Sequence, residues 1–229
     1  MSRWAVMQPY LFPYLGYFQL VRAVDHFVLY DDVQYIKGGW INRNRMNWGG
    51  FTLPLAAGSV HDRIDERRVS QRHYAAFRRK FAKQLRLNYG RAPHYDRCRE
   101  LVETILTPGE YRLGELTCHS VETIGRYLGT ETAFCRGSRL EYDRGGSAQD
   151  RLLCLLRHLS AQHYVNNAGG RSLYASEDFR AAGVTLYFLE AQRPAELPPA
   201  DFGQSILHHI AHHPPERIRE WLGAFRIAP

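Results

Sequence analysis

Residues 4–32 read WAVMQPYLFPYLGYFQLVRAVDHFVLYDD, and this stretch decides the fold. Two short apolar runs, at residues 4–7 and 27–30, each end abruptly in polar residues, as buried strands of a parallel sheet do. Between them Pro13 opens a helical stretch that reaches Val24, because proline is tolerated at the start of a helix. The order of strand, turn, helix and strand predicts a βαβ unit.

The rest of the chain repeats this rhythm. Extended segments are expected at residues 132–136, 164–166 and 184–189, with helices at 148–160, 178–182 and, interrupted by two prolines, 204–222. Such alternation predicts an α/β fold with a mostly parallel, Rossmann-like sheet and helices on both faces. A β-hairpin excursion at 40–55 and a helical insertion at 71–88, 94–106 and 114–128 interrupt it. We expect one domain over residues 1–229, with a helical sub-lobe at 70–128.

Composition narrows the class further. A chain of 229 residues with 45% apolar content can bury a full core. The four cysteines form no CxxC pair, so neither a disulfide framework nor a metal site is expected, and no cofactor is indicated. The absence of a signal peptide and of a run of about 20 apolar residues predicts a cytoplasmic protein with no membrane partner.

The charge is positive, with 30 Lys and Arg against 23 Asp and Glu, which gives +7. This favours anionic partners such as nucleotide-sugars, thioesters, carrier-bound acyl groups or tRNA. The excess is concentrated at residues 63–99, where the helix expected at 71–88 carries cations opposite an apolar stripe. That helix is either a solvated amphipathic face or a surface that binds RNA or a carrier.

Polar residues gather where the first two strands end. Ligands of open α/β sheets bind outside the carboxyl ends of the strands, and Gln8, Asp31 and Asp32 occupy those ends. Consecutive residues of an extended segment point to opposite faces, so only one of the two aspartates reaches a given pocket. Asp32 is the candidate general base, with a turn or cap role as the alternative. Gln8 carries a neutral amide and can only orient a ligand.

The alternating segment at 40–46 adds cations. Arg43 and Arg45 share one face and can clamp a phosphate or carboxylate, with Lys37 adding a point charge. The alternative is an exposed strand whose arginines pair with Asp31 or Asp32. Trp40 either stacks on a ring or covers the hairpin. The remaining candidates for substrate binding in this region are Tyr14, Gly16, Tyr17, Gln34, Tyr35 and Asn42.

Two later motifs also carry candidate residues. Asn166, Gly169 and Gly170 follow a strand and can present backbone amides to an anion, although a tight connection explains them equally well. The histidines at 208, 209, 212 and 213 form two i, i+4 pairs, a spacing that suits a metal on a helix. Without a glutamate between them, a solvated helix is the expected reading.

Three blocks of sequence, QPYLFPYLGYFQLV at 8–21, FVLYDDVQYIKGGWINRNRM at 27–46 and YVNNAGGRSLY at 164–174, resemble the WbqC-like protein family in order and spacing. The resemblance covers nearly the whole chain. It implies a place in O-antigen, capsule or secondary-metabolite biosynthesis. It also implies transfer of a glycyl or related acyl group to an amine or amino-sugar, without established catalytic residues.

A topological analogy concerns residues 14–17. Tyr14 and Tyr17 flank Gly16 after the first strand, where HxGH nucleotidylyltransferases carry two phosphate-binding histidines. Tyrosines replace both, but a helix N-terminus still offers free N–H groups to an anion. This leaves a degenerate HxGH-type nucleotide-binding protein as one alternative.

The expected function is therefore an acyl- or aminoacyltransferase that uses an activated anionic donor and an amine acceptor. In this scheme the acceptor is surrounded by Gln8, Tyr17, Asp32 and Asn42. The phosphates of the donor are held by Lys37, Arg43 and Arg45. A non-catalytic protein that binds RNA or a carrier through the basic helix is the second alternative.

Overall fold

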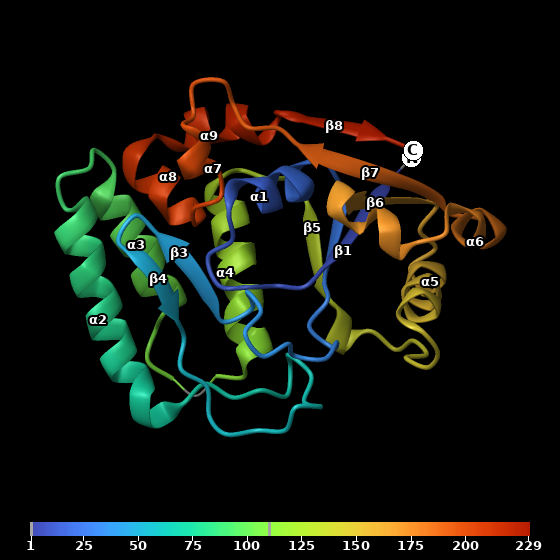
Figure 1. The fold of residues 1–229 in the computed structure, drawn as a ribbon, viewed down its shortest axis with the longest axis horizontal. Coiled ribbons are helices and arrows are strands. Elements are labelled where there is room, and N and C mark those ends of the chain that lie inside the picture. Colours follow the sequence, from blue (N-terminus) through green and yellow to red (C-terminus); the bar gives the residue numbers. More distant parts are fainter. Residues whose placement is uncertain (1, 110) are drawn as a thin grey trace.

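The computed structural model describes residues 2–109 and 111–229, and its core is a six-stranded sheet (Figure 1). The strand order is β5-β2-β1-β6-β7-β8, parallel except for the last pair. The strands are β1 (Arg3–Met7), β2 (His26–Leu29), β5 (Ala133–Arg136), β6 (His163–Asn167), β7 (Thr185–Ala191) and β8 (Phe225–Ala228). The predicted mostly parallel α/β fold is confirmed.

Helices cover both faces of this sheet. One face packs against α1, α4, α8 and α9, and the other against α5 and α6, so that each face has its own apolar cluster. The α-helices are α1 (Leu15–Arg22), α2 (Gln71–Tyr89), α3 (Tyr95–Ile105), α4 (Leu113–Tyr127), α5 (Ala148–His158), α6 (Ser176–Ala181), α7 (Pro199–Phe202), α8 (Ile206–His212) and α9 (Pro215–Leu222). Short 3₁₀ turns are η1 (Gly137–Arg139) and η2 (Ala168–Leu173).

Local sequence explains the central elements. The middle of β1 and nearly all of β2 are buried, because both strands lie inside the sheet with helices on either side. Helix α1 is buried from Leu15 to Val21, as expected of a helix that is apolar all round. Within the described residues, no helix combines the length and apolarity needed to cross a bilayer.

The predicted hairpin forms a separate two-stranded sheet. Its strands are β3 (Arg43–Met46) and β4 (Gly49–Thr52), joined through Asn47 and Trp48. Residues 40–42 form a turn, so the extended segment is shorter than the expected 40–46. Figure 1 shows the hairpin standing beside α2, away from the main sheet.

One strand was missed in the sequence. β8 pairs antiparallel with β7 at the sheet edge, from Phe188 opposite Ala228 to Ala191 opposite Phe225. Only every second residue of β8 is partly covered, and such an edge strand shows a weaker apolar pattern than a central one.

Candidate functional site

The strand order reverses between β1 and β6, and a pocket of about 560 Å³ opens at this point. The chain runs from β1 outward through β2 to β5 and then returns to place β6 on the other side of β1. Met7 and Gln8 at the end of β1 and Asn167 at the end of β6 both line the pocket. Ligands of open α/β sheets bind at such a topological switch point, and the volume suits a small molecule.

Aromatic side chains form the walls of this pocket. Tyr10, Tyr14 and Tyr17 come from the segment after β1, and Trp40 comes from the loop before β3. Tyr10 and Tyr17 meet edge to face, with ring centroids 5.3 Å apart. Trp40 and Ile36 are 55% and 60% exposed at the mouth, where an occupant would cover them. These walls suit a flat ring or the apolar face of a sugar.

The segment between β1 and α1 is fixed at Phe12. This fully buried residue has a φ of 52°, a left-handed conformation that costs of order 1–3 kcal/mol outside glycine. Its amide donates a hydrogen bond to Ser120 Oγ (3.1 Å). Its carbonyl accepts hydrogen bonds from Asn44 Nδ2 (2.6 Å) and Ser205 Oγ (2.9 Å). Helix α4, strand β3 and helix α8 thus hold the strained turn that carries the tyrosines.

Three amide side chains face the pocket in different states. Asn44 already uses both ends of its side-chain amide within the protein. Its Nδ2 donates a hydrogen bond to the Phe12 carbonyl, and its Oδ1 accepts one from the Arg45 amide (2.8 Å). The side-chain amides of Gln8 and Asn167 make no hydrogen bond with any other described residue, while the carbonyl of Gln8 accepts the Tyr17 hydroxyl (3.2 Å). Gln8 and Asn167 are therefore the amides available to a ligand.

Arg45 is the cation of the pocket. Its guanidinium makes no ion pair with the part of the chain that the structure describes, and it lies against Gly203. A Cβ at position 203 would stand 2.8 Å from Arg45 Nη2, so the glycine leaves room for the arginine. The backbone is fixed by the Ser205 amide, which donates to the Arg45 carbonyl (3.0 Å). Arg45 thus offers an uncompensated positive charge from a rigid strand.

The pocket tyrosines are neutral groups. Burial raises the pKa of Tyr10, Tyr14 and Tyr17 above the ordinary value. A raised pKa keeps each phenol protonated at neutral pH, so these hydroxyls can donate hydrogen bonds but cannot act as bases. Among the described lining residues there is no Asp, Glu, His, Cys or Ser.

Asp31 and Asp32 lie after the end of β2, outside this lining, and bind different residues of the segment after β5. Asp31 is 2% exposed and accepts hydrogen bonds from the Ser138 amide (2.8 Å) and hydroxyl (2.7 Å). Burial is the main cause that raises its pKa. Asp32 is fully buried and accepts hydrogen bonds from the Tyr142 hydroxyl and from Arg144 Nε, both at 2.7 Å. The two carboxylates join the end of β2 to the segment after β5.

The other predicted residues of the 34–43 region support the loop. Gln34 donates to the Val60 carbonyl (2.7 Å), and the Tyr35 hydroxyl donates to Asn42 Oδ1 (2.9 Å). Asn42 is buried and also donates to the Leu53 carbonyl (2.8 Å). The Arg43 guanidinium lies 5.2 Å from the centre of the Trp40 ring. Lys37 is exposed and does not line the pocket.

The glycine positions have local explanations. The Tyr14 ring lies over Gly16, where a Cβ would meet ring atom Cε2 at 2.5 Å, so the tyrosine occupies the space that a phosphate would need. A Cβ on Gly170 would stand 2.5 Å from Asn166 Nδ2, whereas Gly169 faces open space. Asn166 is buried, and its Oδ1 accepts the amide of Asn167 (2.8 Å).

The histidine cluster packs against neighbouring helices, with His209 buried and His212 exposed. His209 is fully buried, and burial lowers its pKa to about 3, so it is neutral. His208 Nδ1 lies 2.9 Å from the Tyr89 hydroxyl. Among the described residues, no group of three His, Cys, Asp or Glu side chains is placed to hold a metal ion. The expectation of a solvated helix was therefore wrong for α8, which packs against α3 and α9.

The structure thus brings together five of the predicted site residues, Gln8, Tyr14, Tyr17, Trp40 and Arg45. Sequence reasoning missed Tyr10, Asn167 and Gly203. Asn167 carried a signal, because side chains alternate along a strand and one member of an Asn-Asn pair must face each side. Gly203 lies in an irregular connection, where no sequence pattern marked it as a pocket residue.

Fold and pocket define an α/β protein with a candidate small-molecule pocket at the switch point of a Rossmann-like sheet. A model of the WbqC-like protein family matches residues 8–219, and the chain belongs to this family. It is similar to the uncharacterized protein Rv1507c of Mycobacterium tuberculosis (strain ATCC 25618 / H37Rv), with 29% identity over 198 residues that cover 83% of each protein. No solved structure gives a significant match.

Proposed function

We propose that the protein is a transferase that moves an acyl or aminoacyl group, such as glycyl, from an activated anionic donor to the amine of an amino-sugar or related acceptor. The observation that carries the proposal is the Arg45 side chain, which has no ion-pair partner among the described residues and lines an aromatic pocket with free amides at the switch point. Membership of the WbqC-like family supports a role in polysaccharide or secondary-metabolite biosynthesis.

The lining suits two partners of different chemistry. Stacked against Tyr10 or Trp40, an acceptor ring would have its hydroxyls within reach of the Gln8 and Asn167 amides. Arg45 would hold a phosphate or carboxylate of the donor through charge-assisted hydrogen bonds. Both substrates bind together, because the described lining offers no side-chain nucleophile for a covalent intermediate.

The chemical step is a direct aminolysis. The neutral amine attacks the acyl carbon, a C–N bond forms, and the C–S or C–O bond to the donor's leaving group breaks. The amine proton leaves with the thiolate or alkoxide that departs, or passes to solvent. Positioning of two substrates accounts for most of the rate, and the neutral hydroxyls of Tyr10 and Tyr14 and amide N–H groups stabilise the oxyanion.

The test is thermal unfolding against a panel of acetyl- and glycyl-coenzyme A, UDP- and dTDP-amino-sugars and ATP. A ligand that binds the native state raises the midpoint. We expect a thioester or a nucleotide-amino-sugar to do so, and Arg45→Gln to weaken its binding about 10- to 100-fold, the value of hydrogen bonds to a charged group.

Lys37→Gln is the matched control, because it removes an exposed cation of the same loop that does not line the pocket. It should leave the shift unchanged. A panel in which nothing raises the midpoint, or a shift that survives in Arg45→Gln, would remove the support for this function.

A further inference from the structure

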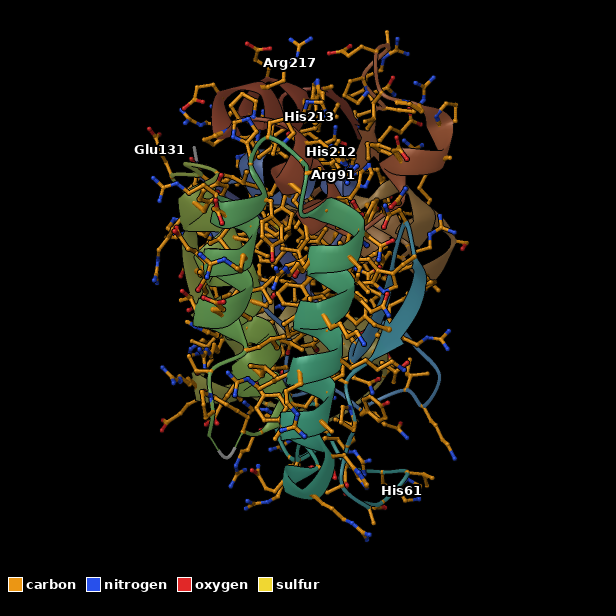
Figure 2. All side chains as sticks on the ribbon, turned by 90° about the vertical axis from the view of Figure 1, so that its left-hand side faces the viewer. His61, Arg91, Glu131, His212, His213 and Arg217 are labelled. Atoms are coloured by element: carbon orange, nitrogen blue, oxygen red, sulfur yellow. The ribbon has the colours of Figure 1, made fainter. Side chains whose placement is uncertain are left out.

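A second groove, of about 640 Å³, lies between the β3–β4 hairpin and α2. It shares no lining residue with the switch-point pocket. Figure 2 looks onto α2, with the hairpin beside it. The hairpin contributes Trp48, Gly50, Phe51 and Thr52, and α2 contributes His73, Ala76, Phe77, Lys80, Phe81 and Gln84.

Aromatic rings form the floor of this groove. The buried Phe81 ring lies 4.9 Å from Phe51, 5.7 Å from Trp48 and 5.8 Å from Phe77, between ring centroids. Trp48 and Phe77 are only half-buried, so parts of their rings remain open to an occupant. Gly50 keeps the hairpin side open, since a Cβ there would meet only the Asn44 carbonyl, at 3.7 Å.

The charge around the groove has one sign. Helix α2 contains no acidic residue in its 19 positions. Its cations are Arg72, Arg78, Arg79, Lys80, Lys83 and Arg86, and none forms an ion pair with a residue at 2–109 or 111–229. On the neighbouring helix α3, by contrast, Arg97 pairs with Glu100 and Arg99 with Glu103.

Helical geometry places these cations beside the groove. Lys80 and His73 stand at its rim. At 100° per residue, Arg72, Arg79, Lys83 and Arg86 form one stripe on the face opposite the buried Tyr74, Phe81 and Leu85. The stripe is about 21 Å long at 1.5 Å per residue. An extended polyanion that places a ring in the groove would therefore continue along this stripe.

We propose that this surface binds single-stranded RNA, with one base stacked in the aromatic groove and the phosphates on Lys80 and the α2 stripe. Aromatic platforms next to a row of cations are the pattern by which proteins hold single strands without sequence preference, because every base has a π-face. An acidic protein partner would use the cations but would leave the ring-sized groove without a function.

The charge arm of the test measures binding of a fluorescein-labelled 12-nucleotide oligouridine by anisotropy, from 50 to 200 mM salt. Each phosphate contact to a single strand contributes about 0.7 to the slope of log K against log salt. The variant Arg79→Gln/Lys83→Gln should lower that slope by about 1.4. Arg97→Gln, which removes a cation paired on α3, should leave it unchanged.

The second part of the test examines base stacking by filling the groove with a larger side chain. Ala76 is exposed and lines the groove, whereas Ala181 at the end of α6 is exposed and does not, so Ala181→Phe is the control for Ala76→Phe. Ala76→Phe should weaken RNA binding by about five-fold or more, the value of one stacked base. Ala181→Phe and the pocket variant Arg45→Gln should bind RNA as the wild type does.

Three results would overturn the proposal. These are absence of RNA binding at 50 mM salt, a salt slope that Arg79→Gln/Lys83→Gln does not change, and equal affinity of the Ala76→Phe and Ala181→Phe variants. Circular dichroism of each variant should match that of the wild type in helix content, so a loss of binding reports on the surface itself.

Discussion

The carboxyl edge of the sheet has two polar regions that differ in what their side chains do. At the ends of β2 and β5, Asp31 and Asp32 are buried and bonded to residues of the segment after β5. At the ends of β1 and β6, Gln8, Arg45 and Asn167 face an open pocket and make no side-chain hydrogen bond with other described residues.

This difference separates a structural polar cluster from a binding site. A buried carboxylate needs hydrogen bonds and a counter-charge, and Ser138, Tyr142 and Arg144 supply them within the protein. The pocket groups need no such partners while water reaches them, and a ligand would replace that water. We therefore assign the binding function to the β1/β6 region and cohesion of the sheet edge to the β2/β5 region.

The largest effect is expected for Asp32→Asn. The change removes the charge that Arg144 meets at 2.7 Å in a site where the carboxylate is fully buried, so the free energy of unfolding should fall by about 2–3 kcal/mol. Urea denaturation measures this. Asp143→Asn, an exposed neighbour, should stay within about 0.5 kcal/mol of the wild type. If Asp32→Asn were as stable as the wild type, the polar cluster at the ends of β2 and β5 would not have the structural role assigned to it.

The adjacent carboxylate, Asp31, makes the stability of the protein depend on pH. Burial raises the pKa of Asp31 above its unfolded value, so its contribution to stability is fully present below pH 3.8 and is lost as pH rises through the native pKa. Asn at position 31 keeps partners for Ser138 without a charge. Asp31→Asn should therefore be at least as stable as the wild type at pH 7 and should lose less stability between pH 4 and 7.

Unfolding curves of Asp31→Asn and the wild type at a series of pH values measure this difference. Two parallel stability profiles would show that Asp31 is ionised in the native state at no cost.

The smallest effects are expected for the two asparagines at the end of β6. Asn166→Ala removes a buried amide whose oxygen accepts a hydrogen bond from the Asn167 N–H. The free energy of unfolding should therefore fall by about 1 kcal/mol. Asn167→Ala should leave stability unchanged and weaken ligand binding about two- to ten-fold, the value of one neutral hydrogen bond. Calorimetry and ligand titration of both variants distinguish the roles, and exchanged effects would place Asn166 in the pocket instead.

Much of the fold was predictable from local pattern. The apolar runs that became β1, β2 and β7 and the helical stripes of α2 to α5 depend on neighbours in sequence. Gln8 and Arg45 were found because strand ends and alternation are local as well. β8 was missed because an edge strand is only half covered.

The roles of the aspartates were not readable in the same way. Their partners Ser138, Tyr142 and Arg144 lie more than 100 positions further along the chain. The sequence shows carboxylates at the sheet edge but not which other segment reaches them. The same holds for Gly203, whose importance depends on the distant Arg45.

The most direct test of the account compares the ligand-induced rise in the unfolding midpoint of the wild type, Arg45→Gln and Asp32→Asn in one experiment. Asp32→Asn should unfold at a lower temperature but retain the full ligand-induced rise. Arg45→Gln should keep the wild-type midpoint without ligand and lose the rise. A rise that is kept in Arg45→Gln and lost in Asp32→Asn would contradict it and place the site at the end of β2.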